Sequence, residues 1–385
     1  MKFVSDLLQI YREASSIRRL FKINKKDREV VFYSEDKSSY TYFEGLIDYL
    51  TREAGKDVYY LTSEVNDPLF NLKNNRLHPF YVKKLLPLFI SLCDSKVLIM
   101  TMPDLGTFHV KRSKYNIKHL YIFHNIGSSF PVIRFGALFN YDTVFCVGPH
   151  HVEEIRTQEG IYGLQKKELV EFGYFRLEKV YKQYRDFSKK ERPPCQWKAR
   201  LLIGPSWGSG SIFNVCGMEL IAVLLREGYE VITRPHPMTN IHEPHIMENI
   251  NTKYRDYLNY KYENDISLYE SLFNSDVLIT DWSGLFYEYA MGTERPVLFI
   301  DLPQKIMNER YGEIGIEPIE VGLRKEIGEV LHPDHLPEVT GVIEQLIREK
   351  EKYRASIIKA RNKYIYNFGH SSKVGAEYIL SYCKG

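Results

Sequence analysis

Short apolar runs alternate with longer stretches of helical spacing along the first half of the chain. Runs of β-branched and aromatic residues predict strands at 30–33, 58–61, 97–101, 120–123 and 143–147. Between these runs, apolar residues recur every three or four positions and predict helices at 42–52, 81–92 and 150–157. Strands that alternate with helices are typical of a doubly wound, mostly parallel sheet.

The same alternation returns in the second half of the chain. Strands are predicted at 201–203, 231–233, 277–279 and 297–300, and helices at 215–226, 266–273 and 285–291. Gly292 is expected to end the last of these helices. We therefore predict an α/β protein with two Rossmann-like, doubly wound domains that face a central cleft, lined by the carboxyl ends of the strands.

Composition shifts divide the chain into five parts. We predict a basic amphipathic helix at 1–28, a first Rossmann-like domain at 29–188, a polar, proline-bearing linker at 189–197, a second Rossmann-like domain at 198–350, and C-terminal helices at 351–385. The C-terminal helices are expected to cross back to the first domain.

The N-terminal segment combines apolar residues at helical spacing with an excess of arginine and lysine. Such a helix can lie on an anionic membrane surface. It can equally be a packing helix with a solvated basic face, and the sequence leaves both interpretations open. A second apolar stretch, at 85–100, is interrupted by Asp94 and Lys96 and is too short to span a bilayer.

Composition narrows the class of protein further. The 385 residues carry a net charge of only +3, so no strong positive field indicates nucleic acid as a partner. The five cysteines are scattered and none forms a C-x-x-C pair, which argues against a disulfide framework or a zinc site and favours a reducing cytoplasm. We expect a cytoplasmic protein, with the basic helix as a candidate contact to the inner face of the membrane.

The strand at 277–279 leads into the stretch with the clearest chemical signal. Small and polar residues follow this strand directly: Thr280, Asp281, Ser283 and Gly284. A helix then begins, and unpaired N–H groups together with the helix dipole favour an anion at its N-terminus. We predict that this turn binds a nucleotide phosphate and that Glu288, in the first turns of the helix, meets the ribose. The alternative is an ordinary capped strand–turn–helix unit.

Two histidines follow predicted strands directly. His124 comes before Asn125, Gly127 and Ser128, and a histidine there can accept a proton from an attacking hydroxyl. His236 lies between two prolines and close to Arg234. A rigidly held imidazole and a guanidinium suit a phosphoryl group. The alternatives are a histidine satisfied by turn backbone and a stiff Arg-Pro-His-Pro turn.

Weaker candidates lie in two other turns. The glycine-rich turn at 204–210 lacks the P-loop ending but brings Ser206 to the edge of the predicted donor site. Ser371 and Ser372 open a late helix, where hydroxyl groups suit a nucleotide edge or serve only as caps. The remaining histidines are expected at the surface: His150, His151, His242, His245, His332 and His335. Asp265 and Asp281 are interpreted as helix caps, so no metal site is expected.

These motifs together resemble the CDP-glycerol glycerophosphotransferase family. The resemblance rests on His124-Asn125-Ile126-Gly127, on Arg234-Pro235-His236-Pro237 and on Thr280-Asp281-Trp282-Ser283 with Glu288. It implies a two-domain GT-B fold and metal-independent transfer of glycerol phosphate from CDP-glycerol to an acceptor hydroxyl, without a cofactor. It also implies a role in teichoic-acid-like or capsular polymer synthesis, with a CDP-polyol donor and a lipid-linked or polysaccharide acceptor.

The resemblance also assigns roles to single residues. His124 would be the base on the acceptor side, with Asn125, Gly127 and Ser128 beside it, and His236 would meet the donor diphosphate. Gly284 stands where the family has a second serine, and in this respect the turn resembles that of nucleotide-sugar 2-epimerases. A GT-B glycosyltransferase, a UDP-sugar 2-epimerase-like enzyme and a non-catalytic assembly protein therefore remain as alternatives.

Overall fold

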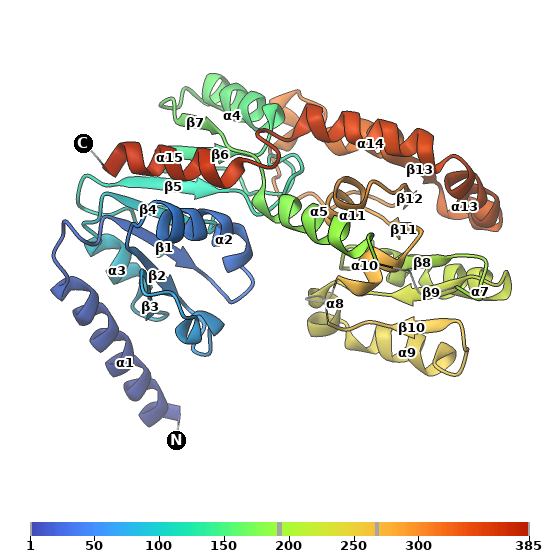
Figure 1. Cartoon of the computed structure of the whole chain (residues 1–385), viewed down its shortest axis with the longest axis horizontal. Helices are drawn as coiled ribbons and strands as arrows, with labels where there is room; N and C mark the ends of the chain where they lie inside the picture. Colours follow the sequence, from blue (N-terminus) through green and yellow to red (C-terminus); the bar gives the residue numbers. More distant parts are fainter. Residues whose placement is uncertain (1, 191–194, 266–268, 384–385) are drawn as a thin grey trace. The chain divides into compact units, whose positions relative to one another are not determined.

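The computed structural model describes residues 2–190, 195–265 and 269–383 and divides the chain into two compact units (Figure 1). The first unit contains Met1–Arg176, Met307–Ile316 and Tyr364–Gly385, and the second contains Leu177–Ile306 and Glu317–Lys363. The division falls before the predicted linker, of which residues 191–194 lie outside the described residues. Helix α5 (Phe175–Phe187) belongs mostly to the second unit because Leu177 and Val180 pack on Gly292 there.

The first unit is built on a seven-stranded parallel sheet with the order β3-β2-β1-β4-β5-β6-β7. The strands are β1 (Val30–Ser34), β2 (Val58–Thr62), β3 (Leu77–Tyr81), β4 (Val97–Met100), β5 (Lys118–Ile122), β6 (Thr143–Cys146) and β7 (Glu168–Glu171). The inner strands are almost entirely buried, as expected for parallel strands covered by helices on both faces.

Helices and short helical turns from distant parts of the chain complete the first unit: α1 (Lys2–Lys22), α2 (Tyr40–Asp48), η1 (Tyr49–Glu53), η2 (Pro68–Asn71), α3 (Leu86–Leu92), α4 (Pro149–Tyr162), η3 (Tyr311–Ile314) and α15 (Ser371–Cys383). The last helix lies beside α2 (Figure 1). Gly45 allows this close approach, since a Cβ there would lie 2.1 Å from Ser372 Oγ. Ala376 and Ile379 of α15 join the core around Phe43 and Phe145.

The second unit contains a six-stranded parallel sheet with the order β10-β9-β8-β11-β12-β13. Its strands are β8 (Arg200–Ile203), β9 (Glu230–Thr233), β10 (Tyr260–Tyr262), β11 (Val277–Thr280), β12 (Val297–Ile300) and β13 (Gly328–Leu331). Its helices, besides α5, are α6 (Ile212–Val215), α7 (Gly217–Arg226), α8 (Pro237–His242), α9 (Pro244–Tyr254), α10 (Glu270–Asn274), α11 (Leu285–Thr293), α12 (Ile319–Ile327), η4 (Pro333–Glu338), α13 (Val339–Arg348) and α14 (Lys350–Tyr364). The two parallel sheets confirm the predicted α/β class.

Every strand that the sequence predicted is present, and the four further strands among the described residues are the edges of the two sheets. These strands are β3, β7, β10 and β13. Edge strands are partly exposed and carry polar residues, so they lack the continuous apolar run that identifies an inner strand. The predicted helix at 81–92 was too long for the same reason, because Tyr81 ends β3 and α3 begins only at Leu86.

The prediction that Gly292 ends its helix was wrong. Helix α11 continues to Thr293, and Glu294 then adopts a left-handed conformation with φ of 57°. Gly292 is needed for packing instead, because a Cβ at this position would lie 2.7 Å from Val180 Cγ1. The glycine therefore permits close contact between α11 and α5.

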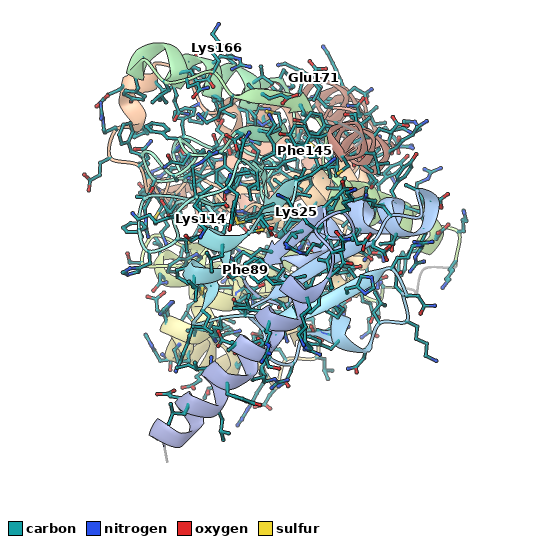
Figure 2. The ribbon with its side chains drawn as sticks, turned by 90° about the vertical axis from the view of Figure 1, so that its left-hand side faces the viewer. Lys25, Phe89, Lys114, Phe145, Lys166 and Glu171 are labelled. Atoms are coloured by element: carbon teal, nitrogen blue, oxygen red, sulfur yellow. The ribbon has the colours of Figure 1, made fainter. Side chains whose placement is uncertain are left out.

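The basic N-terminal segment forms α1, which crosses one face of the first unit (Figure 2). Its C-terminal half is anchored, since Leu20 is buried and the Glu13 carboxylate accepts hydrogen bonds from Lys83 N and Leu85 N at 2.9 and 2.8 Å. Nearer its start, Leu8 and Tyr11 are 65% and 76% exposed. No helix of the described residues combines the length and apolar character needed to cross a membrane.

Candidate functional site

The turn after β11 is organised by one buried carboxylate. Asp281 accepts hydrogen bonds from Ser206 N at 2.7 Å and from Ile212 N at 3.1 Å, so it holds the glycine-rich turn that follows the neighbouring strand β8. Burial raises the pKa of the Asp281 carboxyl, and the backbone N–H groups oppose that shift. Asp281 therefore fixes the backbone of the glycine-rich turn beside the predicted donor site.

Thr280 supports the same turn. Its Oγ1 donates to Gly204 O at 2.8 Å, and Thr280 is fully buried. Gly204 packs so closely on the next helix that a Cβ there would lie 2.5 Å from Leu285 Cδ2. The ends of β8 and β11 and the start of α11 thus form one rigid unit.

The start of α11 presents the groups expected to meet an anion. Gly284 is exposed at the N-cap, and the Ser283 hydroxyl accepts a hydrogen bond from Leu285 N at 3.4 Å. Glu288, in the first turn, is 9% exposed. The nine-residue helix has an accessible glycine at its N-cap, and its dipole favours an anion there, so phosphate binding at this turn stays a prediction.

His236 is the N-cap of α8, and its Nδ1 accepts a hydrogen bond from Met238 N at 3.2 Å. Because Nδ1 accepts, the ring proton of the neutral imidazole resides on Nε2. Burial, followed by the nearby charge of Lys305, lowers the pKa of His236 to about 4. At neutral pH this histidine is therefore a hydrogen-bond donor rather than a source of protons.

Arg234 lies at the end of β9 with its side chain buried. Its Nη1 lies 3.4 Å from both the Glu263 carboxylate and the Ser271 hydroxyl. Ser271 in turn donates to Glu263. The positive charge of Arg234 is thus shared with an internal carboxylate.

In the first unit, His124 follows β5 and is exposed. Its ring makes an edge contact with Tyr42 at a centroid distance of 6.0 Å, and Tyr174 Oη donates to its backbone oxygen at 3.0 Å. Although the ring keeps access to solvent, desolvation by the neighbouring groups lowers the pKa of His124, and a hydrogen bond with the backbone of Thr101 opposes this shift. The imidazole is therefore largely unprotonated at neutral pH, as a general base must be.

The loop after His124 is held by two histidines that the sequence analysis had placed at the surface. His150 and His151 are buried, which contradicts that prediction. Their Nε2 atoms lie 2.7 Å from Ile126 O and 2.8 Å from Gly127 O. The reason is topological: α4 starts at the end of β6, beside β5, so its first turn faces the loop that carries His124.

Glu154, one turn further along α4, was missed by the sequence analysis. Its Oε2 accepts from Ser129 N at 2.8 Å and from Ser129 Oγ at 2.7 Å. Within the loop, Asn125 Oδ1 accepts from Gly127 N at 3.2 Å, and Ser128 is 1% exposed. The sequence did contain a signal for these supporting residues, namely two histidines and an acid at the start of a helix that follows a buried strand.

Ser371 and Ser372 lie in the first unit, whereas the other predicted donor-binding residues lie in the second. Ser371 is fully buried at the start of α15, and Ser372 lies against α2 at Gly45. Their positions favour a structural role for both serines, in the packing of α15, over binding of the nucleotide.

The buried histidines predict a pH dependence of stability. Burial lowers the pKa of His150 to about 4 and that of His151 well below its ordinary value. Below pH 6.5 the unfolded chain binds protons that the folded chain excludes. The two histidines therefore make their full contribution to the free energy of unfolding above pH 6.5, and this contribution is lost as the pH falls toward 4. We expect His150 alone to contribute a loss of about 2 kcal/mol between pH 6.5 and 5.

Urea unfolding of the wild type and of His150→Gln at pH 7 and pH 5 measures this effect. The variant should lose less stability on acidification than the wild type, because the two proteins differ only at His150. An equal loss in both proteins would contradict the role of His150.

The chain has two units, and each has a parallel sheet with candidate residues after its strands. This architecture belongs to the GT-B class of folds. Solved structures share this fold over nearly the whole chain. The wall teichoic acid polymerase TagF is 13% identical, covers 98% of each chain and gives a TM-score of 0.59. MnaA of S. aureus, in a structure with UDP, is 14% identical, covers 93% of this chain and 97% of that one, and gives 0.60.

Sequence comparison is more specific. Residues 138–308 match the sequence model of the CDP-Glycerol:Poly(glycerophosphate) glycerophosphotransferase family. A teichoic acid poly(glycerol phosphate) polymerase of Bacillus spizizenii is 31% identical over 147 residues, which is 35% of this chain and 35% of that protein. The chain therefore matches about a third of that relative's length. These matches agree with the family resemblance of the motifs at Arg234–Pro237 and Thr280–Glu288, which lie within 138–308, whereas the His124 motif lies outside the matched residues.

Proposed function

We propose that this protein is an enzyme that transfers glycerol phosphate from CDP-glycerol to an acceptor hydroxyl in the synthesis of a teichoic-acid-like polymer. The observation that carries the proposal is the family match at 138–308, which includes Arg234, His236 and the turn from Thr280 to Glu288. The lowered pKa of His124 and the donor tautomer of His236 support it, because each suits its role at neutral pH.

The proposed reaction is an in-line displacement at the phosphorus that bears glycerol. His124 takes the proton of the acceptor hydroxyl as its oxygen forms a bond to that phosphorus. The bond from this phosphorus to the bridging oxygen breaks, and CMP leaves with the bonding electrons. His236 donates its Nε2–H to the phosphate oxygens as charge develops on them.

The turn at Ser283 and Gly284 binds the leaving phosphate in this proposal, and Glu288 meets the ribose. Asp281 contributes indirectly by fixing the turn that carries Ser206. The chemistry described uses positioned donors and a base, so we propose that transfer needs neither a metal nor a cofactor. Turnover should then persist in excess chelator.

Incubation with radiolabelled CDP-glycerol and a polyol-phosphate acceptor tests the proposal directly. Transfer of label to the acceptor, with release of CMP, is the expected result. Parallel reactions with UDP-sugars provide the comparison. Label transfer from a UDP-sugar, without transfer from CDP-glycerol, would contradict the proposed donor.

A second candidate is a UDP-sugar 2-epimerase-like enzyme. It is favoured by Gly284 and by the fold likeness to a solved UDP-N-acetylglucosamine 2-epimerase, which is 12% identical and gives a TM-score of 0.56. Such an enzyme would interconvert a UDP-sugar without any acceptor. Nuclear magnetic resonance of a UDP-sugar incubated with the protein alone distinguishes the two, since a glycerophosphotransferase leaves the sugar unchanged.

We further propose that the acceptor is a lipid-linked or polysaccharide chain, of teichoic-acid or capsular type, and that α1 contacts an anionic membrane at the inner face. Leu8 and Tyr11 are exposed beside basic residues such as Arg12 and Arg18. An apolar strip flanked by positive charge suits the interface of an anionic bilayer.

Replacing Leu8 and Tyr11 together by glutamate is expected to weaken partition onto anionic vesicles at least tenfold, because two inserted apolar side chains become charged. Co-sedimentation with vesicles of phosphatidylglycerol and phosphatidylcholine measures the change. Leu258→Glu is the matched control, since Leu258 is 86% exposed in the second unit. Unchanged partition would leave α1 as a packing helix only.

A further inference from the structure

Trp207 and Lys305 form an aromatic and cationic cluster in the second unit, and neither has a role in the reaction described above. Lys305 Nζ lies 3.1 Å from the centroid of the Trp207 ring. Trp207 follows β8 and Lys305 follows β12, and these two strands lie on either side of β11. The loops that carry the two residues therefore meet beside the strand that leads to Ser283 and Gly284.

The cluster also includes His236. The rings of Trp207 and His236 are nearly parallel, with centroids 6.3 Å apart and an interplanar angle of 27°. His242 stacks on Trp207 as well, at 5.6 Å. The Lys305 ammonium therefore lies in the immediate surroundings of the histidine predicted to meet the donor phosphates.

A diphosphate needs a cation that the other candidate residues do not supply. Arg234 is buried and shares its charge with Glu263. His236 is a neutral donor whose Nδ1 is already used by Met238 N. Lys305, in contrast, is exposed. Its contact with the indole face is weak compared with a charge-assisted hydrogen bond to a phosphate oxygen.

We infer that Lys305 is the cation that binds the diphosphate of the nucleotide-linked donor, and that Trp207 holds its ammonium beside His236 until the donor arrives. This inference depends on the proposed function only for which nucleotide binds, because CDP-linked and UDP-linked donors both carry a diphosphate. Charge at this position then aids binding of any nucleoside diphosphate far more than binding of the uncharged nucleoside.

Calorimetric titration of the full chain with CDP, cytidine, UDP and uridine tests the inference. Lys305→Met should weaken binding of the preferred diphosphate about tenfold to hundredfold, as expected for loss of a charge-assisted contact, and leave nucleoside binding unchanged. Lys305→Arg should restore most of the affinity. Lys253→Met is the control, because Lys253 also lies over an aromatic ring, that of Tyr254, at 5.3 Å on α9.

The outcomes separate the two proposals. If Lys305→Met binds diphosphate like the wild type, or loses nucleoside and diphosphate equally, the inference is wrong even when the wild type transfers glycerol phosphate. If the wild type prefers UDP to CDP and Lys305→Met weakens UDP selectively, the inference holds and the proposed donor is wrong. A wild type that binds neither diphosphate overturns both.

Discussion

Replacing His236 by asparagine is expected to lower turnover of CDP-glycerol by about two to three powers of ten, as for loss of one preorganised donor to a developing oxyanion. Asparagine can still cap α8, because its side-chain oxygen can accept the hydrogen bond of Met238 N. Its short amide does not place an N–H where Nε2 stood. The loss should appear mainly in kcat, since the donor acts on charge that develops in the transition state.

His242→Asn is the matched control for this experiment. His242 is exposed and stacks on the same Trp207 ring, so its loss tests the effect of disturbing the cluster without removing the predicted donor. Steady-state kinetics of both variants should show near-wild-type turnover for His242→Asn alone. Near-normal turnover of His236→Asn or of His236→Ala would refute the role assigned to His236.

Replacing His124 by asparagine is expected to lower kcat/KM by about two to four powers of ten, the usual contribution of a positioned base. The pH dependence identifies the role more sharply. A base acts when unprotonated, and the pKa of His124 lies below its ordinary value. Wild-type kcat/KM should therefore be level near pH 7 and fall only as the pH drops below about 6.5.

The acidic fall in kcat/KM should disappear from the His124→Asn variant, because the group that titrates has been removed. His109→Asn, an exposed histidine on another loop of the first unit, should keep the wild-type profile. Persistence of the same acidic fall in His124→Asn would show that another group is the base. The profiles of kcat/KM for the acceptor are measured between pH 5 and 8 at saturating CDP-glycerol.

The inner strands of both sheets were predictable because a parallel strand covered on two faces must be apolar throughout. Val277–Thr280 and Val97–Met100 are fully buried and were recognised from their sequence alone. The edge strands were not recognisable. Glu168–Glu171, for example, has polar ends and partly exposed centres, and only its pairing with β6 makes it a strand.

The candidate site divides in a similar way. Residues that directly follow an apolar strand, such as His124 and Asp281, were identified from the sequence because chain order fixes their position at a sheet edge. Residues that support them from other elements were not. Glu154 and the pair His150 and His151 reach the His124 loop only because β5 and β6 are neighbours.

The sequence by itself determined the parallel α/β class, the turns that end the strands, and the residues those turns carry. These follow from local periodicity and chain order, which need no knowledge of distant contacts. The tertiary structure alone decided that Arg234 is engaged by Glu263, that His236 keeps its proton on Nε2, and that Lys305 lies on Trp207. Charge and protonation depend on which groups folding brings within a few ångströms, and residues far apart in the chain carry no local signal of that proximity.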